Sequence, residues 1–374
     1  MRVRELRVWF TILVASWLHS GALYAASAPA LLKAKHEAEA KGFMFEISRE
    51  EIIAKAKKEA KLRVISSLEV ENLKPVSEAF KKKYPFIDIR AEEIAGTDSY
   101  QRMILEMKSG TGRGWDVNYM TTDFYDDYLP YQKKFDVLGM AQQGVLQIPL
   151  GMIDPVNRNT VSYTTNTQVV AYNKTLISED KVPNTWEDFL KPEFKGRKFV
   201  VDIRPQEVAN LVPAWGLEKT LQYARAIAAQ NPIWIRGHSR TLAAMVAGEY
   251  PMLLGANLNS TKRAMEKDKT KVLDFKVVEP VPIRIGNHES VFSNAASPYA
   301  GLLWLEFVAS PEAQNIINSD HSGSVFVPGT TPYQLTQGKK VTLLGWEHAP
   351  KLEELQKKVF EAYGFPKAEP VGKK

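Results

Sequence analysis

The stretch "TVSYTTNTQVVAYN" (160–173) decides the fold, because it is an extended run longer than a typical strand. A second extended run, "VEPVPIRIGNHESVF" (278–292), carries several prolines and few helix formers. Alternating strand and helix patterns precede the first run and resume between the two runs. We therefore predict two α/β lobes joined by two crossing strands, with the chain leaving the first lobe near 165 and returning near 285.

The first lobe follows from the pattern before residue 121. "LRVISS" (62–67), "FIDIRAEEI" (86–94) and "WDVNYM" (115–120) are predicted strands. The motif Ser48-Arg49-Glu50-Glu51 is a capping-box pattern that opens a helix before the first strand. "ENLKPVSEAFKKKYP" (71–85) is an amphipathic helix between the first two strands. Strands and helices that alternate at this spacing predict a parallel sheet.

The second lobe repeats this alternation. One predicted strand lies at the end of "TWEDFLKPEFKGRKFVVD" (185–202), and a second is "PIWIRG" (232–237). A third lies at the start of "PMLLGANLNS" (251–260). We expect Trp186 in the core of this lobe. The predicted boundaries are 45–165 and 286–345 for lobe one, 166–285 for lobe two, and 346–374 for a C-terminal helix and tail.

The N-terminus has the order of a secretory signal peptide. Three arginines form a basic head, an apolar run covers residues 8–18, and small residues follow at 22–30. The apolar run is short for a membrane span, so we expect export with removal of residues 1–25. A retained N-terminal anchor is the alternative. No later segment is apolar enough to cross a bilayer. The chain has no cysteine, which excludes disulfides and lipid anchoring through an N-terminal cysteine.

The charge balance gives no sign of a nucleic-acid partner. The formal net charge is +6. Removing residues 1–25 takes away three arginines and one glutamate, which lowers the formal net charge of the mature chain by two. The remaining lysines and arginines are scattered, without the basic block that nucleic-acid binding uses. An exported chain of this kind is expected to diffuse freely in a periplasm.

Catalytic motifs do not emerge from the sequence. It has no cysteine nucleophile, no Gly-x-Ser-x-Gly elbow and no His-Glu-x-x-His metal helix, and its six histidines show no metal-ligand spacing. "SGTGRGW" (109–115) follows a helix and precedes a strand, the reverse of a phosphate cradle. In "HES" (288–290), neighbouring side chains point to opposite faces. We expect no enzyme activity, no cofactor and no metal site; a periplasmic enzyme on the same fold is the rival hypothesis.

Polar residues gather at the carboxyl ends of predicted strands in both lobes. In open α/β sheets, ligands bind in the crevice outside these ends. Each serine, threonine or asparagine there could be an ordinary helix cap, but a set that recurs across both lobes favours a shared cleft. Arg204, Arg236 and Arg240 are either solvated charges or contacts to an anionic ligand. The predicted ligand-binding residues are Ser66, Ser67, Thr97, Thr121, Tyr163, Thr165, Arg204, Ser239, Asn257, Asn259 and Glu289.

With these features, the sequence resembles the extracellular solute-binding proteins of bacterial ABC importers, particularly the family 1 branch with the ferric-ion-binding proteins. The resemblance covers about residues 45–330. It implies a type II periplasmic binding fold, a small-molecule ligand held between two lobes, delivery to an ABC permease, and action as a monomer. The stretches that carry it are "LRVISSLEVENLKPVSEAFKKKYP" (62–85), "VVAYNKTLISEDKVPNTWEDFLKPEFKGR" (169–197), "LAAMVAGEYPMLLG" (242–255) and "LLWLEFVASPEAQ" (302–314).

The resemblance is weaker on the ligand. Ferric-binding relatives carry adjacent tyrosines in the loop after the strand that corresponds to "PMLLG", where this chain has Asn257, Leu258, Asn259 and Ser260. Many relatives also hold a synergistic anion with an arginine near the first crossing strand, where this chain has "SYTTNT" (162–167). Asparagine and threonine suit a carboxylate, phosphonate or hydroxyl and are poor ferric ligands.

We therefore predict a periplasmic substrate-binding protein of an ABC importer that captures a small anionic organic solute. A ferric-ion or metal-complex binding protein is the alternative. A sensory protein that hands its ligand to a membrane receptor is a third hypothesis.

Overall fold

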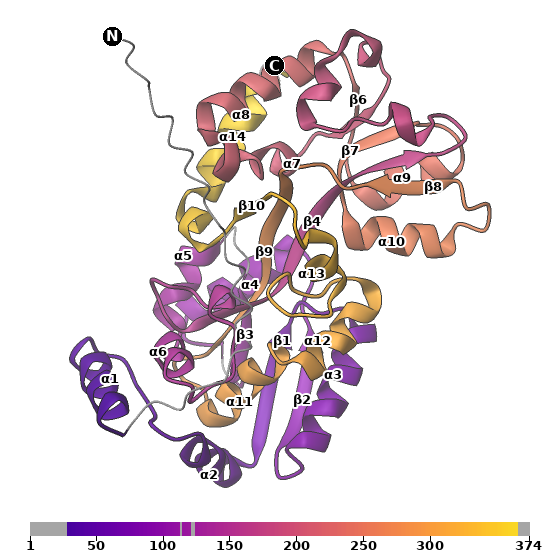
Figure 1. Cartoon of the computed structure of the whole chain (residues 1–374). Coiled ribbons are helices and arrows are strands. Elements are labelled where there is room, and N and C mark those ends of the chain that lie inside the picture. Colours follow the sequence, from indigo (N-terminus) through magenta and orange to yellow (C-terminus); the bar gives the residue numbers. More distant parts are fainter. Residues whose placement is uncertain (1–27, 113, 121–123, 366–374) are drawn as a thin grey trace, which may run out of the picture.

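The computed structural model describes residues 28–112, 114–120 and 124–365. The predicted signal peptide (1–25) and the predicted ligand residue Thr121 lie outside these ranges. The described chain forms two lobes, one above the other in Figure 1, with long strands running between them. One ten-stranded sheet passes through both lobes in the order β2-β1-β3-β9-β4-β7-β5-β6, with β10 beside β9 and β8 beside β4. A search of the described helices finds none whose length and hydropathy would let it cross a lipid bilayer.

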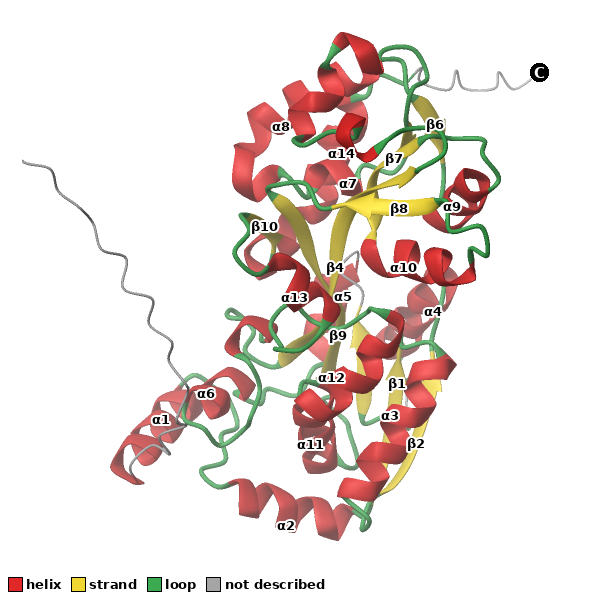
Figure 2. Ribbon diagram, turned by 45° about the vertical axis from the view of Figure 1, so that its right-hand side comes forward, coloured by secondary structure: helices red, strands yellow, loops and turns green. Residues whose placement is uncertain are grey.

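Lobe one is built on three parallel strands, as the sequence pattern predicts. β1 (Lys61–Ser66) lies between β2 (Asp88–Glu93) and β3 (Val117–Met120). Leu62 and Val64 of β1 are fully buried. In Figure 2, α1 extends away from the body of this lobe. The helices of lobe one are α1 (Ala28–Ala40), α2 (Arg49–Glu59), α3 (Val70–Lys83), α4 (Thr97–Lys108), α5 (Tyr125–Tyr128), α6 (Val137–Gln142), α11 (Pro298–Val308) and α12 (Pro311–Ile317).

The local sequence explains where the helices of lobe one begin and how they pack. The Ser48 side chain accepts a hydrogen bond from the backbone N–H of Glu51 at the start of α2, which satisfies one of the free amides of the helix end. Along α3, Val76 and Phe80 recur at helical spacing and are fully buried. The ring of Phe80 meets Trp304 of α11 edge-on, with 5.4 Å between ring centroids. The predicted amphipathic helix is confirmed.

Two long strands cross between the lobes, and this confirms the prediction made from the two extended runs. β4 (Thr160–Asn173) and β9 (Val281–Val291) pair antiparallel over residues 160–167 and 283–290. The far end of β9 pairs with β3 in lobe one, whereas the far end of β4 pairs with β7 and β8 in lobe two. Each crossing strand is therefore part of the sheet in both lobes.

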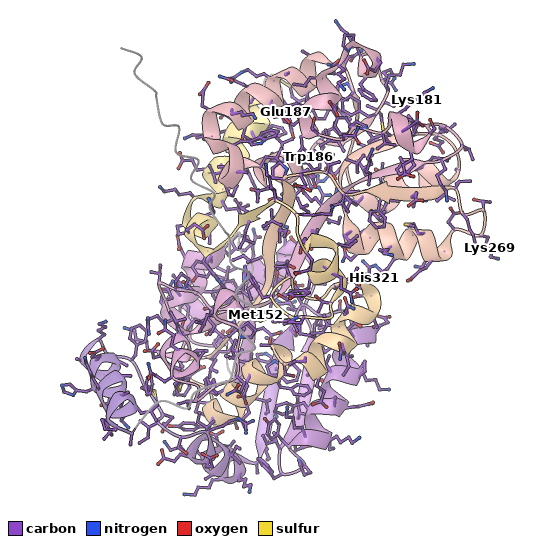
Figure 3. All side chains as sticks on the ribbon, in the orientation of Figure 1. Met152, Lys181, Trp186, Glu187, Lys269 and His321 are labelled. Carbon is purple, nitrogen blue, oxygen red and sulfur yellow. The ribbon has the colours of Figure 1, made fainter. Side chains whose placement is uncertain are left out.

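Lobe two repeats the α/β plan beyond the crossing strands. Trp186 lies in its core as predicted: the side chain is 1% exposed, stacks on Phe189 and donates its indole N–H to the carbonyl of Pro280 at 3.0 Å (Figure 3). The strands and helices of this lobe are β5 (Val200–Asp202), β6 (Ile233–Ile235), β7 (Met252–Asn257), β8 (Leu273–Lys276), α7 (Gln206–Ala209), α8 (Val212–Ala229), α9 (His238–Val246) and α10 (Leu258–Lys267).

The C-terminal segment joins the crossing strands and then covers lobe two. After α13 (Thr331–Thr336), β10 (Val341–Leu344) pairs in parallel with the first residues of β9. α14 (Leu352–Ala362) packs against α7 and α8 (Figure 1), and its residue Val359 is buried in the lobe-two core. In the described part of the predicted C-terminal helix and tail (346–374), the apolar face of α14 leaves water by packing on lobe two.

α10 of lobe two also contacts lobe one directly. The contacting residues of α10 are Asn259, Arg263 and Glu266. They are four and three positions apart in the chain, which places them on one face of the helix. Figure 3 labels His321, which lies at the level where the two lobes meet. We call these contacts the α10 seam, defined by three pairs that each join α10 to a loop of lobe one: Asn259–Ser322 (3.1 Å), Arg263–Glu69 (3.0 Å) and Glu266–His321 (2.9 Å).

Removing the charged residues of the α10 seam is expected to open the two lobes. An exposed ion pair contributes roughly 0.2–1 kcal/mol, so the double variant Arg263→Ala/Glu266→Ala should shift the ligand-free protein toward a wider separation. Small-angle X-ray scattering would detect this as a larger radius of gyration. The matched control is Arg225→Ala/Glu218→Ala on α8, which removes the same two charges from an exposed pair 3.8 Å apart. Equal radii for the two double variants would contradict the expectation.

Candidate ligand-binding site

The carboxyl ends of strands from the two lobes face the same gap. β1 ends at Ser66, shortly before Glu69, and β7 ends at Asn257, just before α10 and Arg263. Because Glu69 and Arg263 form an ion pair at 3.0 Å, these two strand ends lie opposite each other across the gap. This is the position at which open α/β sheets bind their ligands.

A cavity of about 520 Å³ runs along α9 and α10 of lobe two and reaches the gap at Glu69. Glu69 of lobe one lines it together with Ser239, Ser260 and Arg263 of lobe two. Its volume lies within the range of small-molecule sites. A larger hollow of about 920 Å³ lies on lobe two beside residues such as Pro251, at the amino end of β7, and so away from the gap. We therefore place the candidate site at the smaller cavity, which Ser239 lines.

Three predicted ligand residues form a buried cluster in lobe one instead of lining the gap. Ser66, Tyr163 and Glu289 each have a 0% exposed side chain. The Tyr163 hydroxyl lies 3.0 Å from Ser66 Oγ and donates to Glu289 Oε1 at 3.0 Å. Trp304 Nε1 of α11 donates to Glu289 Oε2 at 2.7 Å. The prediction is wrong for these three, because side chains alternate between faces along a strand and these point toward the core under α11.

Burial changes the acid strength of the carboxyl in this cluster. Removal from water raises the pKa of Glu289 to about 7. Hydrogen bonds from Ser66, Trp304 and Tyr163 favour the ionised form and offset only part of this effect. The cluster is thus a stabilising hydrogen-bond network whose strength depends on pH.

The other predicted residues of lobe one differ in exposure. The Thr165 hydroxyl is buried and accepts a hydrogen bond from the Val325 N–H at 2.9 Å, so it fixes the loop after α12 to β4. Ser67 is half-buried, and its hydroxyl has no hydrogen-bond partner within the described chain. Thr97 is exposed at the first residue of α4. Thr97 stays available to a ligand, whereas the Ser67 hydroxyl is buried and the Thr165 hydroxyl is engaged.

Arg204 is already paired inside lobe two. Its Nε donates to Asp202 Oδ1 at 3.0 Å, and a second guanidinium nitrogen donates to Oδ2 at 2.5 Å. Burial raises the pKa of Asp202, but hydrogen bonds from Arg204 and from the Gly237 N–H outweigh this and lower it overall. The predicted role of Arg204 as an anion contact is therefore corrected, because its donors are directed at a carboxylate of the protein.

The asparagines after β7 are placed at the gap. Asn257 is half-buried and begins α10, but its side chain makes no capping hydrogen bond. Asn259 donates to Ser322 across the α10 seam at 3.1 Å. The side-chain amide of Asn257 therefore does not cap α10, whereas the side chain of Asn259 is held in place by the hydroxyl of Ser322 in lobe one.

Sequence reasoning missed one cluster in lobe two. Asp202, Glu207 and His238 come from three elements, β5, α7 and α9, and one ligand-type atom of each lies within 4.8 Å of the others. Asp202 and His238 both follow predicted strands, and this was the available signal. Their separation along the chain hid the cluster from a search based on metal-ligand spacing.

A family model described as a bacterial extracellular solute-binding protein matches residues 76–342. The chain belongs to this family. The family and the two-lobe fold expected from the sequence are both confirmed. The extracellular solute-binding proteins are transport proteins, not a family of enzymes. No curated protein matches the chain.

Solved solute-binding proteins share this fold at low sequence identity. The apo ferric ion-binding protein A of Pasteurella haemolytica is 17% identical with a TM-score of 0.62, covering 83% of this chain and 100% of that chain. A Trichodesmium protein in complex with iron and citrate is 17% identical with a TM-score of 0.63, covering 82% and 100%. The substrate-binding protein of an Agrobacterium tumefaciens ABC transporter is 18% identical with a TM-score of 0.59, covering 81% and 94%.

The stability of this solute-binding protein is expected to fall with rising pH because of Glu289. The folded pKa of about 7 exceeds the ordinary value of 4.5. Between these values the folded state holds a proton that the unfolded state has lost, so the free energy of unfolding decreases as pH rises and levels off above 7. The variant Glu289→Gln removes this pH dependence. Its free energy of unfolding, taken relative to that of the wild type, should therefore rise by about 3 kcal/mol between pH 4.5 and pH 8.

Urea unfolding at pH 5 and pH 8 measures this difference. The matched control is Glu193→Gln at an exposed position, which should follow the wild type at both pH values. A constant offset between Glu289→Gln and the wild type at the two pH values would show that Glu289 does not titrate on folding.

Proposed function

We propose that the chain is the periplasmic receptor of an ABC importer, which captures a small solute between its lobes and delivers it to a permease of the inner membrane. The observation that carries this is the opposed position of the β1 and β7 carboxyl ends across one gap, in a chain of the solute-binding family. The N-terminal signal pattern supports export.

The crossing strands supply the mechanism of capture. β4 and β9 are the long connections between the lobes, so small dihedral changes near their ends can rotate one lobe against the other. A solute that contacts both lobes favours the closed arrangement, and binding shifts an existing equilibrium toward it. The permease would then recognise the closed form. This scheme needs no second copy of the chain, and we propose that it acts as a monomer.

We propose a small organic anion as the solute. Asn257 and Ser239 offer hydrogen-bond donors at the gap, and each lies at or beside the N-terminus of a helix, α10 or α9. Arg236 directly follows β6, Arg240 lies on α9, and both are exposed. With Arg204 committed to Asp202, these two guanidinium groups are the candidates for charge pairing.

Iron is the second candidate solute, because several structural neighbours are described as ferric-binding. Phenol oxygens suit a hard ferric ion. Tyr100 of α4 and Tyr119 of β3 are half-buried, with ring centroids 5.2 Å apart, near the strand ends of lobe one. These two tyrosines are 19 positions apart in the chain, so a search for adjacent tyrosines does not find them.

A thermal-melting screen is expected to identify the solute class. The mature protein would be unfolded and refolded to remove carried-over ligand, then heated with carboxylates, phosphonates, sugars, polyamines, or ferric ion with and without citrate. A solute at 100 times its dissociation constant stabilises the fold by about 2.7 kcal/mol, which raises the midpoint by a few degrees. We expect this shift with an organic anion.

Variants at the gap test the placement of the site. Asn257→Ala should abolish the shift without lowering the midpoint of the ligand-free protein, since the side chain makes no cap hydrogen bond. Asn184→Ala, at an exposed asparagine of lobe two, is the control and should keep the shift. A shift with ferric ion alone and a visible charge-transfer band would select the iron hypothesis. No shift with any solute would contradict the proposed function.

A further inference from the structure

Lobe two contains a compact group of metal-ligating side chains that the proposed function does not use. His238 Nε2 lies 3.1 Å from Glu207 Oε1 and 3.7 Å from Asp202 Oδ2. The three residues are between 2% and 5% exposed. They come from the end of β5, from α7 and from the start of α9, so the fold brings them together from three elements. Within the described chain, this is the one such cluster of three histidine or carboxylate ligands.

Two atoms of the cluster are buried without hydrogen-bond partners. Glu207 Oε2 and His238 Nε2 both lack a partner in the described structure, although Nε2 is close to the other carboxylate oxygen of Glu207. A buried carboxylate is costly unless it is paired or coordinates a metal. The nearby guanidinium of Arg204 is directed at Asp202. The cluster thus places two buried carboxylates and one imidazole nitrogen around one point, with Glu207 Oε2 unpaired.

We propose that Asp202, Glu207 and His238 bind a divalent first-row transition-metal ion within lobe two. One imidazole nitrogen and two carboxylate oxygens form a ligand set that suits Zn²⁺ and its neighbours in the first row. Bonds of about 2.0–2.1 Å in a tetrahedral site separate ligand atoms by roughly 3.3 Å. The two separations from His238 Nε2, 3.1 and 3.7 Å, lie on either side of this value, and all three ligand atoms lie within 4.8 Å of one another.

Surrounding contacts orient the ligands. The Gly237 N–H donates to Asp202 Oδ2 at 2.9 Å, and Arg204 holds the same carboxylate, as outer contacts do around metal ligands. The Asn257 N–H donates to His238 Nδ1 at 3.3 Å, a long hydrogen bond. Metal at Nε2 leaves the ring proton on Nδ1, so this contact must open. Metal occupancy is thereby linked to Asn257, the N-cap residue of α10, and α10 carries the seam between the lobes.

The cluster is buried on the lobe-two side of the gap, next to Asn257 and Ser239, and its test does not depend on the identity of the solute. Tag-free mature protein would be dialysed against EDTA and then titrated with Zn²⁺ in a calorimeter and with Co²⁺ in a spectrophotometer. We expect about one equivalent of metal per chain. We also expect visible d–d bands of a four-coordinate nitrogen–oxygen site for Co²⁺. The absence of cysteine removes thiolate bands from the spectrum.

The near-isosteric variant Glu207→Gln should weaken Zn²⁺ binding at least about tenfold and reduce the Co²⁺ bands. The matched control is the double variant His321→Gln/Glu266→Gln, which removes a different close His–Glu pair, 2.9 Å apart on the α10 seam, and should bind as the wild type. Should Glu207→Gln fail to fold by circular dichroism, His238→Gln takes its place. Uptake of well under one equivalent, or equal affinity in the cluster and control variants, would overturn the proposal.

Discussion

The antiparallel pairing of β4 with β9 is the constraint on which the two-lobe structure depends. The ladder between residues 160–167 and 283–290 fixes both strands to each other, and their outer ends belong to different lobes. Backbone groups inside such a sheet must stay paired, so the strands cannot separate and can only twist or bend. Relative motion of the lobes is thereby limited to a hinge at this ladder, with the α10 seam on one side of the gap.

The polar residues at the strand ends serve three different purposes because they differ in burial. Ser66, Tyr163 and Glu289 satisfy one another in the core of lobe one. Asp202 and its neighbours form a charged cluster inside lobe two. The residues around Asn257 and Ser239 remain next to the gap and can meet a solute. A single sequence signal, a polar residue after a strand, thus covers structural, charged and ligand-facing positions.

Local patterns predicted the fold well, because periodicity and caps act over a few residues. The extended runs, the Ser48 cap and the amphipathic α3 all follow from such patterns. The site was less accessible, since it depends on contacts between distant residues. Arg204 could not be recognised as paired without the side-chain geometry of Asp202, and Glu207 joins His238 only after α7 folds onto β7. The position of α14 on lobe two was hidden for the same reason.

The central claim, that the lobes close on a solute about the crossing strands, is tested most directly by a distance between the lobes. The chain has no cysteine, so spin labels can be placed at Glu78→Cys on α3 and Lys269→Cys after α10, both exposed, and measured by pulsed electron resonance. A pair within lobe two, Lys181→Cys with Lys269→Cys (Figure 3), is the control. The account predicts that a solute found by thermal melting shortens the interlobe distance and leaves the control distance unchanged. An interlobe distance that stays the same at saturating solute would contradict it.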